Sequence, residues 1–216
     1  MSLNILDKKY FIFDLDGTLI DSNSLHEKAF LVALEGTGKE FDYRNFHGVK
    51  TLDVFTSLGF SLDVAKNLTK KKQEEYRKYI LSGDVTVFKG VDQIFKRLIF
   101  DGKKIFLCTG ASRKSVNQII DSMGWKSIFT DTICGDEVEF SKPDPLILNE
   151  LIERNGLLRD NILYVEDSDK GLETGINGNV DTVIVNNYFE NAIISFSEFL
   201  DFYEYYFEFS KIKGVA

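Results

Sequence analysis

Cysteine, proline, tryptophan and histidine are all scarce in this chain. Its 216 residues include two cysteines, two prolines, one tryptophan and two histidines. The cysteines, Cys108 and Cys134, lie in apolar runs far apart in the sequence, which predicts buried, reduced thiols of a cytosolic protein rather than a disulfide framework. The first nine residues contain no apolar signal-peptide core. We therefore expect a cytoplasmic location.

Long hydrophobic runs and clustered positive charge are missing as well. No apolar stretch approaches the roughly 20 residues that a membrane-spanning helix needs, so we expect no membrane partner. The formal net charge of -8 argues against nucleic acid as a partner, because phosphate contacts require clustered lysine and arginine. The densest basic run, Lys70–Lys72, is followed at once by Gln73-Glu74-Glu75, a pattern typical of a solvated helix face.

The rest of the composition, 44% hydrophobic and 28% charged, is that of a globular protein. After about residue 85, short β-branched or aromatic runs alternate with helical stretches. This alternation predicts an α/β fold, with a Rossmann-like parallel sheet and helices on both of its faces. The expected strands are 11–13, 105–109, 132–134, 162–166 and 182–186, and the expected helices are 91–100, 112–123, 145–155 and 171–178.

Residues 20–86 interrupt this rhythm. They show no convincing strand, but Ser24 and Glu27 form a capping box that predicts a helix start. Further helices are expected at 51–58 and 62–81. We therefore predict two domains. The catalytic core comprises residues 1–19 and 87–216, and a small all-helical domain is inserted at 20–86.

The C-terminal segment 195–209 opens with a second capping box, formed by Ser195 and Glu198. Aromatic residues follow at helical spacing, with acidic residues between them. We expect a helix that packs this aromatic stripe on the sheet. A dimer contact is the alternative, so the chain is expected to be a monomer or a weak homodimer.

The first expected strand ends in Asp14-Leu15-Asp16-Gly17-Thr18. Carboxylates two residues apart on a strand point to opposite faces. Where the strand gives way to a loop at Gly17, both can turn toward the carboxyl end of the sheet, where α/β proteins bind ligands. Two like charges held close together repel unless a cation or a shared proton is present. The motif favours a divalent metal and covalent chemistry on an electrophile; the alternative is an Asp-Gly surface turn.

Three later segments carry further polar residues. Thr109 ends a strand and leads through Gly110 and Ala111 into a helix, where backbone amides and the helix dipole favour an anion. Lys142 lies in Ser-Lys-Pro-Asp-Pro, whose prolines predict a rigid loop. Glu166 and Asp167 follow a strand and add carboxylates to the same edge of the sheet.

Taken in order, these four segments resemble the four signature motifs of the haloacid dehalogenase superfamily, in its capped phosphatase and β-phosphoglucomutase-like branch. The resemblance implies that the helical residues 20–86 form a cap. It also implies that Asp14 attacks phosphorus to form an aspartyl-phosphate, and that Asp16 acts as general acid and then general base.

The resemblance further implies magnesium as the cofactor. Its ligands would be Asp14, the backbone carbonyl of Asp16, and Asp167 with Glu166. Lys142 and Thr109 would bind phosphoryl oxygens. Further substrate contacts are expected from Gly17, Thr18, Gly110 and Ala111.

The choice between hydrolysis and phosphoryl migration depends on the cap. His26, twelve residues after Asp14, is similar in position to a histidine of β-phosphoglucomutase and related sugar-phosphate phosphatases, although it is equally compatible with a helix surface. His47 and Lys50 are candidates for the basic cap residue that mutases display. We predict a phosphatase that hydrolyses a small phosphorylated metabolite, such as a sugar phosphate or phosphoglycolate. The alternative is a phosphomutase, and a non-catalytic binding module ranks below both.

Overall fold

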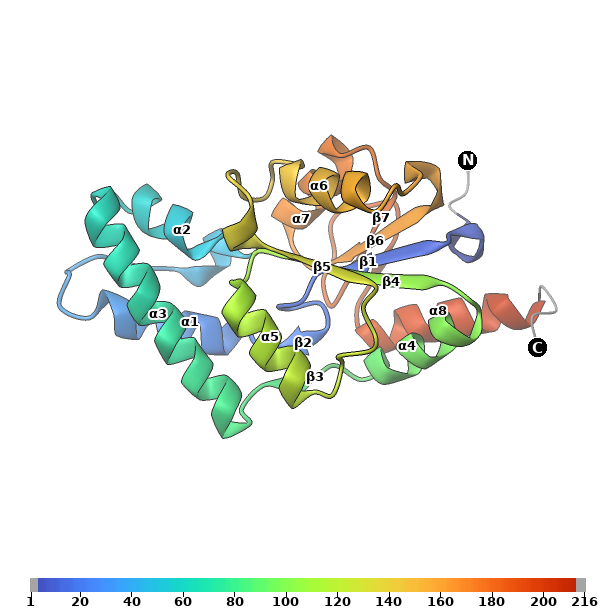
Figure 1. The fold of residues 1–216 in the computed structure, drawn as a ribbon, viewed down its shortest axis with the longest axis horizontal. Helices are drawn as coiled ribbons and strands as arrows, with labels where there is room; N and C mark the ends of the chain where they lie inside the picture. The colour runs from blue at the N-terminus through green and yellow to red at the C-terminus, as the bar shows by residue number, and fades with distance from the viewer. Residues whose placement is uncertain (1–3, 213–216) are drawn as a thin grey trace.

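The computed structural model describes residues 4–212, and its centre is a six-stranded parallel sheet (Figure 1). The inner strands are buried runs of β-branched and aromatic residues, as expected for a parallel sheet covered on both faces. The predicted α/β fold is confirmed. In spatial order the strands are β5 (Asp131–Cys134), β4 (Lys104–Thr109), β1 (Tyr10–Phe13), β6 (Ile162–Glu166), β7 (Thr182–Val185) and β8 (Ser195–Phe196).

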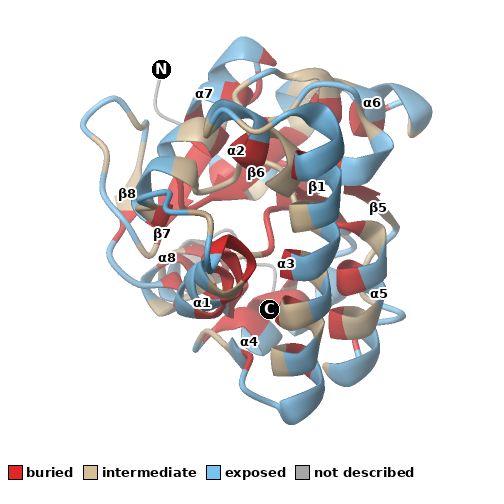
Figure 2. Ribbon diagram, turned by 90° about the vertical axis from the view of Figure 1, so that its left-hand side faces the viewer, coloured by how far each residue is buried: buried red, intermediate tan, exposed pale blue. Residues whose placement is uncertain are grey.

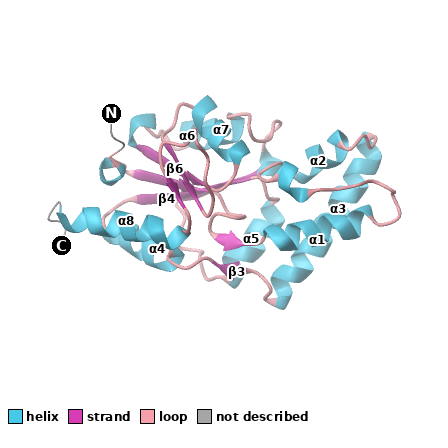
Figure 3. Cartoon of the chain, turned by 180° about the vertical axis from the view of Figure 1, so that it is seen from behind, coloured by secondary structure: helices cyan, strands magenta, loops and turns pink. Residues whose placement is uncertain are grey.

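Helices cover both faces of the sheet, as predicted (Figures 1 and 3). Side chains alternate along β1, so Phe11 and Phe13 pack into one apolar cluster while Ile12 packs into another on the opposite face. The first face carries α4 (Val91–Phe100), α5 (Arg113–Ser122) and α8 (Phe199–Ile212), and the second carries α6 (Leu146–Arg154) and α7 (Asp169–Asn177).

The aromatic stripe of the C-terminal helix packs on the central strand, as predicted. The ring of Tyr206 lies 5.7 Å from that of Phe11, and the ring of Phe199 lies 6.2 Å from that of Phe13. The predicted capping box at Ser195 is wrong. Ser195 pairs with Ile184 in the parallel ladder between β7 and β8, and the helix begins only at Phe199.

Three helices lie to one side of the sheet (Figure 1), facing the viewer in Figure 2, and form a unit with its own apolar cluster. This helical unit contains α1 (Asn23–Leu34), α2 (Thr51–Ser57) and α3 (Leu62–Ser82), close to the predicted bounds. The expected N-cap at Ser24 is wrong. Ser22 occupies that position, and its hydroxyl donates a hydrogen bond to Oδ1 of Asp16 at 2.6 Å.

Two short strands join the helical unit to the sheet, contrary to the expectation of none between residues 20 and 86. Residues Ile20–Asp21 form β2, which pairs antiparallel with β3, Thr86–Val87. Strands of two residues are too short to show an alternating pattern, so no periodicity reveals them. The pairing brings the two chain connections to the helical unit side by side.

Short 3-10 helices complete the described chain, at Ile5–Asp7, Tyr43–Phe46, Gly135–Glu137 and Arg159–Asn161. Within residues 4–212, none of the helices combines the length and the apolar character that crossing a bilayer would demand.

Candidate active site

The first motif forms a tight loop at the carboxyl end of β1. Asp14 follows the strand directly and is 4% exposed. Gly17 has a φ of +85°, and a Cβ at this position would lie 2.1 Å from Oδ2 of Asp167. Glycine therefore allows the loop after β1 and the loop after β6 to touch. Thr18 completes this contact by donating a hydrogen bond to Oδ1 of Asp167 at 3.0 Å.

Lys142 lies between two of the predicted acidic residues. Its Nζ donates to Oδ1 of Asp14 at 2.7 Å and to Oε1 of Glu166. Burial by itself lowers the pKa of Lys142, but the negative charges of Asp14 and Glu166 outweigh burial and raise this pKa above its usual value. The ammonium group is therefore charged at neutral pH and is fixed beside Asp14.

Asp14, Glu166 and Asp167 form a buried acidic cluster in which one oxygen of each lies within 4.8 Å of the others. Burial and the charge of Glu166 raise the pKa of Asp167 to about 8. Burial also raises the pKa of Asp14, although Lys142 opposes this. Three carboxylates face one ammonium, so a divalent cation would offset the remaining negative charge. Carboxylate oxygens are the ligands that Mg²⁺ prefers, and the donor set fits this ion.

The segment after β4 approaches the same place. Thr109 is 1% exposed, and its hydroxyl oxygen accepts a hydrogen bond from the backbone N–H of Ala111 at 3.1 Å. Ser112 is the N-cap of α5. Thr109, Gly110 and Ala111 line a cavity of about 30 Å³ together with Asp14 and Asp16. The remaining lining residues come from the helical unit and are His26, Phe30, Tyr43, Gly48, Val49, Thr51 and Lys72.

The carboxylate of Asp16 belongs to a second group of contacts, which reaches into the helical unit. Nε2 of His26 lies 2.9 Å from Oδ1 of Asp16, and the hydroxyl of Tyr76 donates to the same oxygen at 2.9 Å. On the other side of the imidazole, Nδ1 of His26 lies 2.5 Å from Nζ of Lys72. His26 is thus a buried contact of Asp16 and not a helix-surface residue.

Lys72 lines the cavity, although the sequence pattern predicted that it would be exposed to solvent. The run Lys70–Lys72 was expected to be solvated, but Lys72 is 3% exposed and its Nζ lies 4.5 Å from the centre of the Phe30 ring. Successive helical residues point about 100° apart, so three consecutive lysines cannot share one face. The signal that could have found Lys72 is its spacing of four from Tyr76, which is also buried.

The electrostatics of this second group differ from those of the first. Burial lowers the pKa of Lys72 to about 7, although the charge of Asp16 opposes the shift. Burial also lowers the pKa of His26. For Asp16, burial alone would raise the pKa, but His26 and the hydrogen bonds from Ser22 and Tyr76 lower it. Asp16 is therefore ionised, with a neutral imidazole between it and a lysine that titrates near neutrality.

His47 and Lys50, the other two residues expected to contact substrate from the helical unit, lie outside this cavity. The ring of His47 lies 4.7 Å from that of Tyr43. His47 lines a larger cavity of about 620 Å³, and Gly17 and Asp167 line the same cavity. Nζ of Lys50 donates to the backbone carbonyl oxygens of Val138, at 3.4 Å, and Glu139.

These contacts define what the arrangement can do. Asp14 lines a small cavity together with the loop that leads into α5, and its carboxylate is bound by a fixed ammonium. An anionic, electrophilic group would be attracted to this place and would meet a nucleophile there.

Comparison with known proteins points in the same direction. The family model described as haloacid dehalogenase-like hydrolase matches residues 11–185. A phosphoglycolate phosphatase of Psychrobacter arcticus is 29% identical over 192 residues, which cover 82% of this chain and 83% of the relative. A phosphorylated carbohydrates phosphatase of Thermotoga maritima is 25% identical over 177 residues, covering 80% and 82%.

A solved structure has the same fold. The β-phosphoglucomutase of Clostridium difficile superimposes with a TM-score of 0.83 and 20% identity, covering 97% of this chain and 100% of that one. At this identity the likeness shows the fold and not the reaction.

Proposed function

The chain belongs to the haloacid dehalogenase-like hydrolases, and from that premise we propose that it is a magnesium-dependent phosphatase acting through an aspartyl-phosphate. Its substrate would be a small phosphorylated metabolite, such as a sugar phosphate or phosphoglycolate. The observation that carries this proposal is that Asp14 lines one small cavity with the Thr109 loop while its carboxylate binds the ammonium of Lys142.

In the proposed reaction Asp14 attacks phosphorus in line and the ester oxygen leaves. Lys142 and Thr109 bind phosphoryl oxygens, and Asp16 supplies the proton to the leaving group before it deprotonates the attacking water. Asp14, Glu166 and Asp167, with the backbone carbonyl of Asp16, would hold magnesium. When bound, this ion supplies positive charge that shields the nucleophile from the phosphoryl group.

The contacts of Asp16 suggest where its proton comes from. A proton can pass from Nζ of Lys72 to Nδ1 of His26 while the proton on Nε2 passes to Asp16. The imidazole stays neutral throughout, and the charges of Lys72 and Asp16 cancel. The 2.5 Å between Nζ of Lys72 and Nδ1 of His26, and the pKa of about 7 for Lys72, support the first transfer. Nε2 of His26 lies 2.9 Å from Oδ1 of Asp16 but is not aligned with it as a hydrogen-bond donor, so the second transfer requires the imidazole to turn toward this oxygen.

The helical unit would act as the cap over the site, and its residues favour hydrolysis over phosphoryl migration. A mutase must hold a second phosphate group while the first one reacts. Among the described residues that line the small cavity, Lys72 is the only lysine or arginine that the helical unit contributes, and it already contacts His26. Release of inorganic phosphate from a hexose phosphate supports the phosphatase, whereas an isomeric phosphate without release supports the mutase.

The decisive test removes the nucleophile. Asp14→Asn should lower kcat for a generic phosphate ester by at least about 10³-fold, because no other group can form the covalent intermediate. Circular dichroism should show an unchanged fold, and the exposed Asp63→Asn should keep full activity. Wild-type protein should also bind fluoroberyllate. Turnover by Asp14→Asn would refute the mechanism, and wild-type protein that neither turns over nor binds fluoroberyllate would indicate a non-catalytic binding module.

A further inference from the structure

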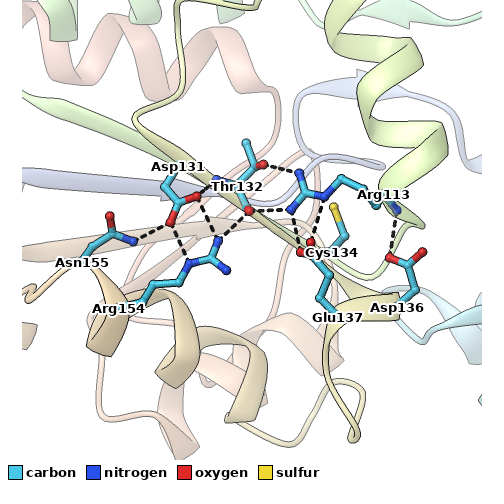
Figure 4. Close-up of polar contacts among 8 residues, drawn as sticks. All are labelled: Arg113, Asp131, Thr132, Cys134, Asp136, Glu137, Arg154 and Asn155. Carbon is cyan, nitrogen blue, oxygen red and sulfur yellow. Dashed lines mark hydrogen bonds and ion pairs between the residues drawn. The ribbon is translucent and has the colours of Figure 1, made fainter.

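The edge strand β5 is paired only on one side within the described sheet, and side chains take up its outward backbone groups (Figure 4). The carbonyl oxygen of Thr132 accepts hydrogen bonds from Nη2 of Arg113 at 2.7 Å and from Nη2 of Arg154 at 2.6 Å. The N–H of Cys134 donates to Oε2 of Glu137 at 2.8 Å. An edge satisfied in this way is protected from pairing with another strand.

The two arginines come from different elements and do different things. Arg154, on α6, forms its other bonds with Asp131 at 2.7 and 3.0 Å. Arg113 is the first residue of α5 and binds Glu137 with both Nε, at 3.0 Å, and Nη2, at 2.6 Å. Arg113 therefore ties the start of α5 to the segment that follows β5, whereas Arg154 ties α6 to the strand alone.

The segment after β5 also serves the first turn of α5 directly. The backbone N–H of Arg113 donates to Oδ1 of Asp136 at 2.9 Å, so a carboxylate from another segment accepts from the helix N-terminus. Ser112, the N-cap residue, makes no capping bond with its side chain, and its hydroxyl lies 3.1 Å from that of Ser115.

The same segment touches the loop that is proposed to bind the phosphoryl group. The N–H of Gly135 donates to the carbonyl oxygen of Ala111 at 3.0 Å. A Cβ at Gly135 would lie 2.4 Å from the carbonyl oxygen of Gly110, and a Cβ at Gly110 would lie 2.7 Å from that of Gly48. The loop 109–111 is thus enclosed between residues 135–137 on one side and the helical unit on the other.

We propose that Arg113 and Glu137 are positioning residues for phosphoryl binding. Through their ion pair they hold residues 135–137 against the loop 109–111, and so fix its amides and the Thr109 hydroxyl relative to Asp14. This inference rests on the proposed function of that loop. Neither side chain is among those lining the small cavity, so their effect on the reaction passes through the loop.

The test compares two arginines that are matched in exposure and in target. The side chain of Arg113 is 31% exposed and that of Arg154 is 38% exposed, and both donate to the carbonyl of Thr132. Arg113→Ala should lower kcat/KM and weaken competitive inhibition by inorganic phosphate by between about tenfold and a hundredfold, because the loop is misplaced. Arg154→Ala should lower the melting temperature similarly while leaving both constants within about twofold of wild type.

Glu137→Gln provides a second variant in case Arg113→Ala does not fold. It should weaken inhibition by phosphate, and adding Arg113→Ala to it should cost little more, because the two residues act as one pair. If Arg113→Ala keeps the phosphate constant of the wild type, or if Arg154→Ala loses as much, the positioning role is overturned. A wild-type protein without phosphatase activity would instead refute the proposed function.

Discussion

Two buried lysines in the site have pKa shifts of opposite sign. Lys142 touches two carboxylates, which outweigh the effect of burial and raise its pKa. Lys72 touches a neutral imidazole and aromatic rings, so burial dominates and lowers its pKa to about 7. At the scale of single residues, the partner of a buried lysine decides whether it serves as a fixed charge or as a proton donor.

The proposed proton path predicts that the effect of Lys72 depends on the leaving group. Lys72→Met should lower kcat for an alkyl phosphate at least about tenfold, because an alkoxide needs a proton to leave. For p-nitrophenyl phosphate, whose leaving group is stable without a proton, kcat should change little. Steady-state kinetics on both esters give the comparison, with the exposed Lys71→Met as control. Equal losses on the two esters would contradict the path.

The lowered pKa of Lys72 also predicts a pH dependence of stability. Between pH 7 and the usual lysine value of 10.5, the folded protein binds fewer protons at this site than the unfolded chain. The contribution of Lys72 to the free energy of unfolding therefore rises with pH across this window. Urea titrations at several pH values measure the free energy of unfolding of both proteins. The value for Lys72→Met minus that for wild type should be largest near pH 7 and smallest near pH 10. Lys71→Met should show no such trend.

Gly171 lies against a buried carboxylate of the site, and its replacement should be destabilising. In an open helix, alanine would be more stable than glycine by about 0.5–1 kcal/mol. Here a Cβ would lie 1.9 Å from Cδ of Glu166, so Gly171→Ala should instead cost about 1–3 kcal/mol through overpacking. Chemical denaturation measures the sign. The exposed Glu173→Ala on the same helix is the control. If Gly171→Ala is more stable than wild type, the Glu166 side chain can move away from the added methyl group at little cost.

At the scale of elements, the segment between α1 and α2 connects the helical unit to the sheet. Gly48 approaches Ser168 and Gly110, and the ammonium of Lys50 binds the carbonyls of residues 138 and 139, shortly before Lys142. At this position Lys50 could hold the helical unit against the sheet, or it could bind substrate.

Lys50→Met distinguishes these two roles. If Lys50 holds the unit closed, KM should rise about tenfold, equivalent to about 1.4 kcal/mol, and by the same factor for p-nitrophenyl phosphate and phosphoglycolate. If Lys50 binds an anionic group of the substrate, only the value for phosphoglycolate should rise. The exposed Lys66→Met on α3 should leave both KM values unchanged.

The elements themselves were largely predictable because their signals are local. The long helices of the helical unit and the inner strands of the sheet follow the spacing of apolar residues, and their bounds agree closely with the structure. Ser24 and Ser195 show the limit of this approach. Both begin sequences that satisfy the capping-box pattern. However, Ser22 is the N-cap of α1 and donates to Asp16, and Ser195 pairs with β7 as part of the sheet.

At the scale of the whole molecule, three carboxylates from two separate strand ends meet in the interior. Their repulsion predicts that magnesium stabilises the fold. At a concentration 100 times Kd, binding should add about 2.7 kcal/mol and raise the melting temperature by roughly 5–10 °C. Thermal denaturation with magnesium and with EDTA measures this, and Asp167→Asn should lose the increase. A melting temperature that does not change when magnesium is added would argue against the metal site independently of any activity.

The amino-acid sequence by itself determined which residues end the parallel strands. Because the carboxyl ends of such strands share one edge of the sheet, Asp14, Thr109 and Asp167 were expected to lie near one another, and the family resemblance added Lys142. Only the tertiary structure decided the partners of Lys72, Lys50 and Arg113. These contacts depend on how the helical unit and the β5 edge are oriented against the rest of the chain, and no local pattern of residues encodes that orientation.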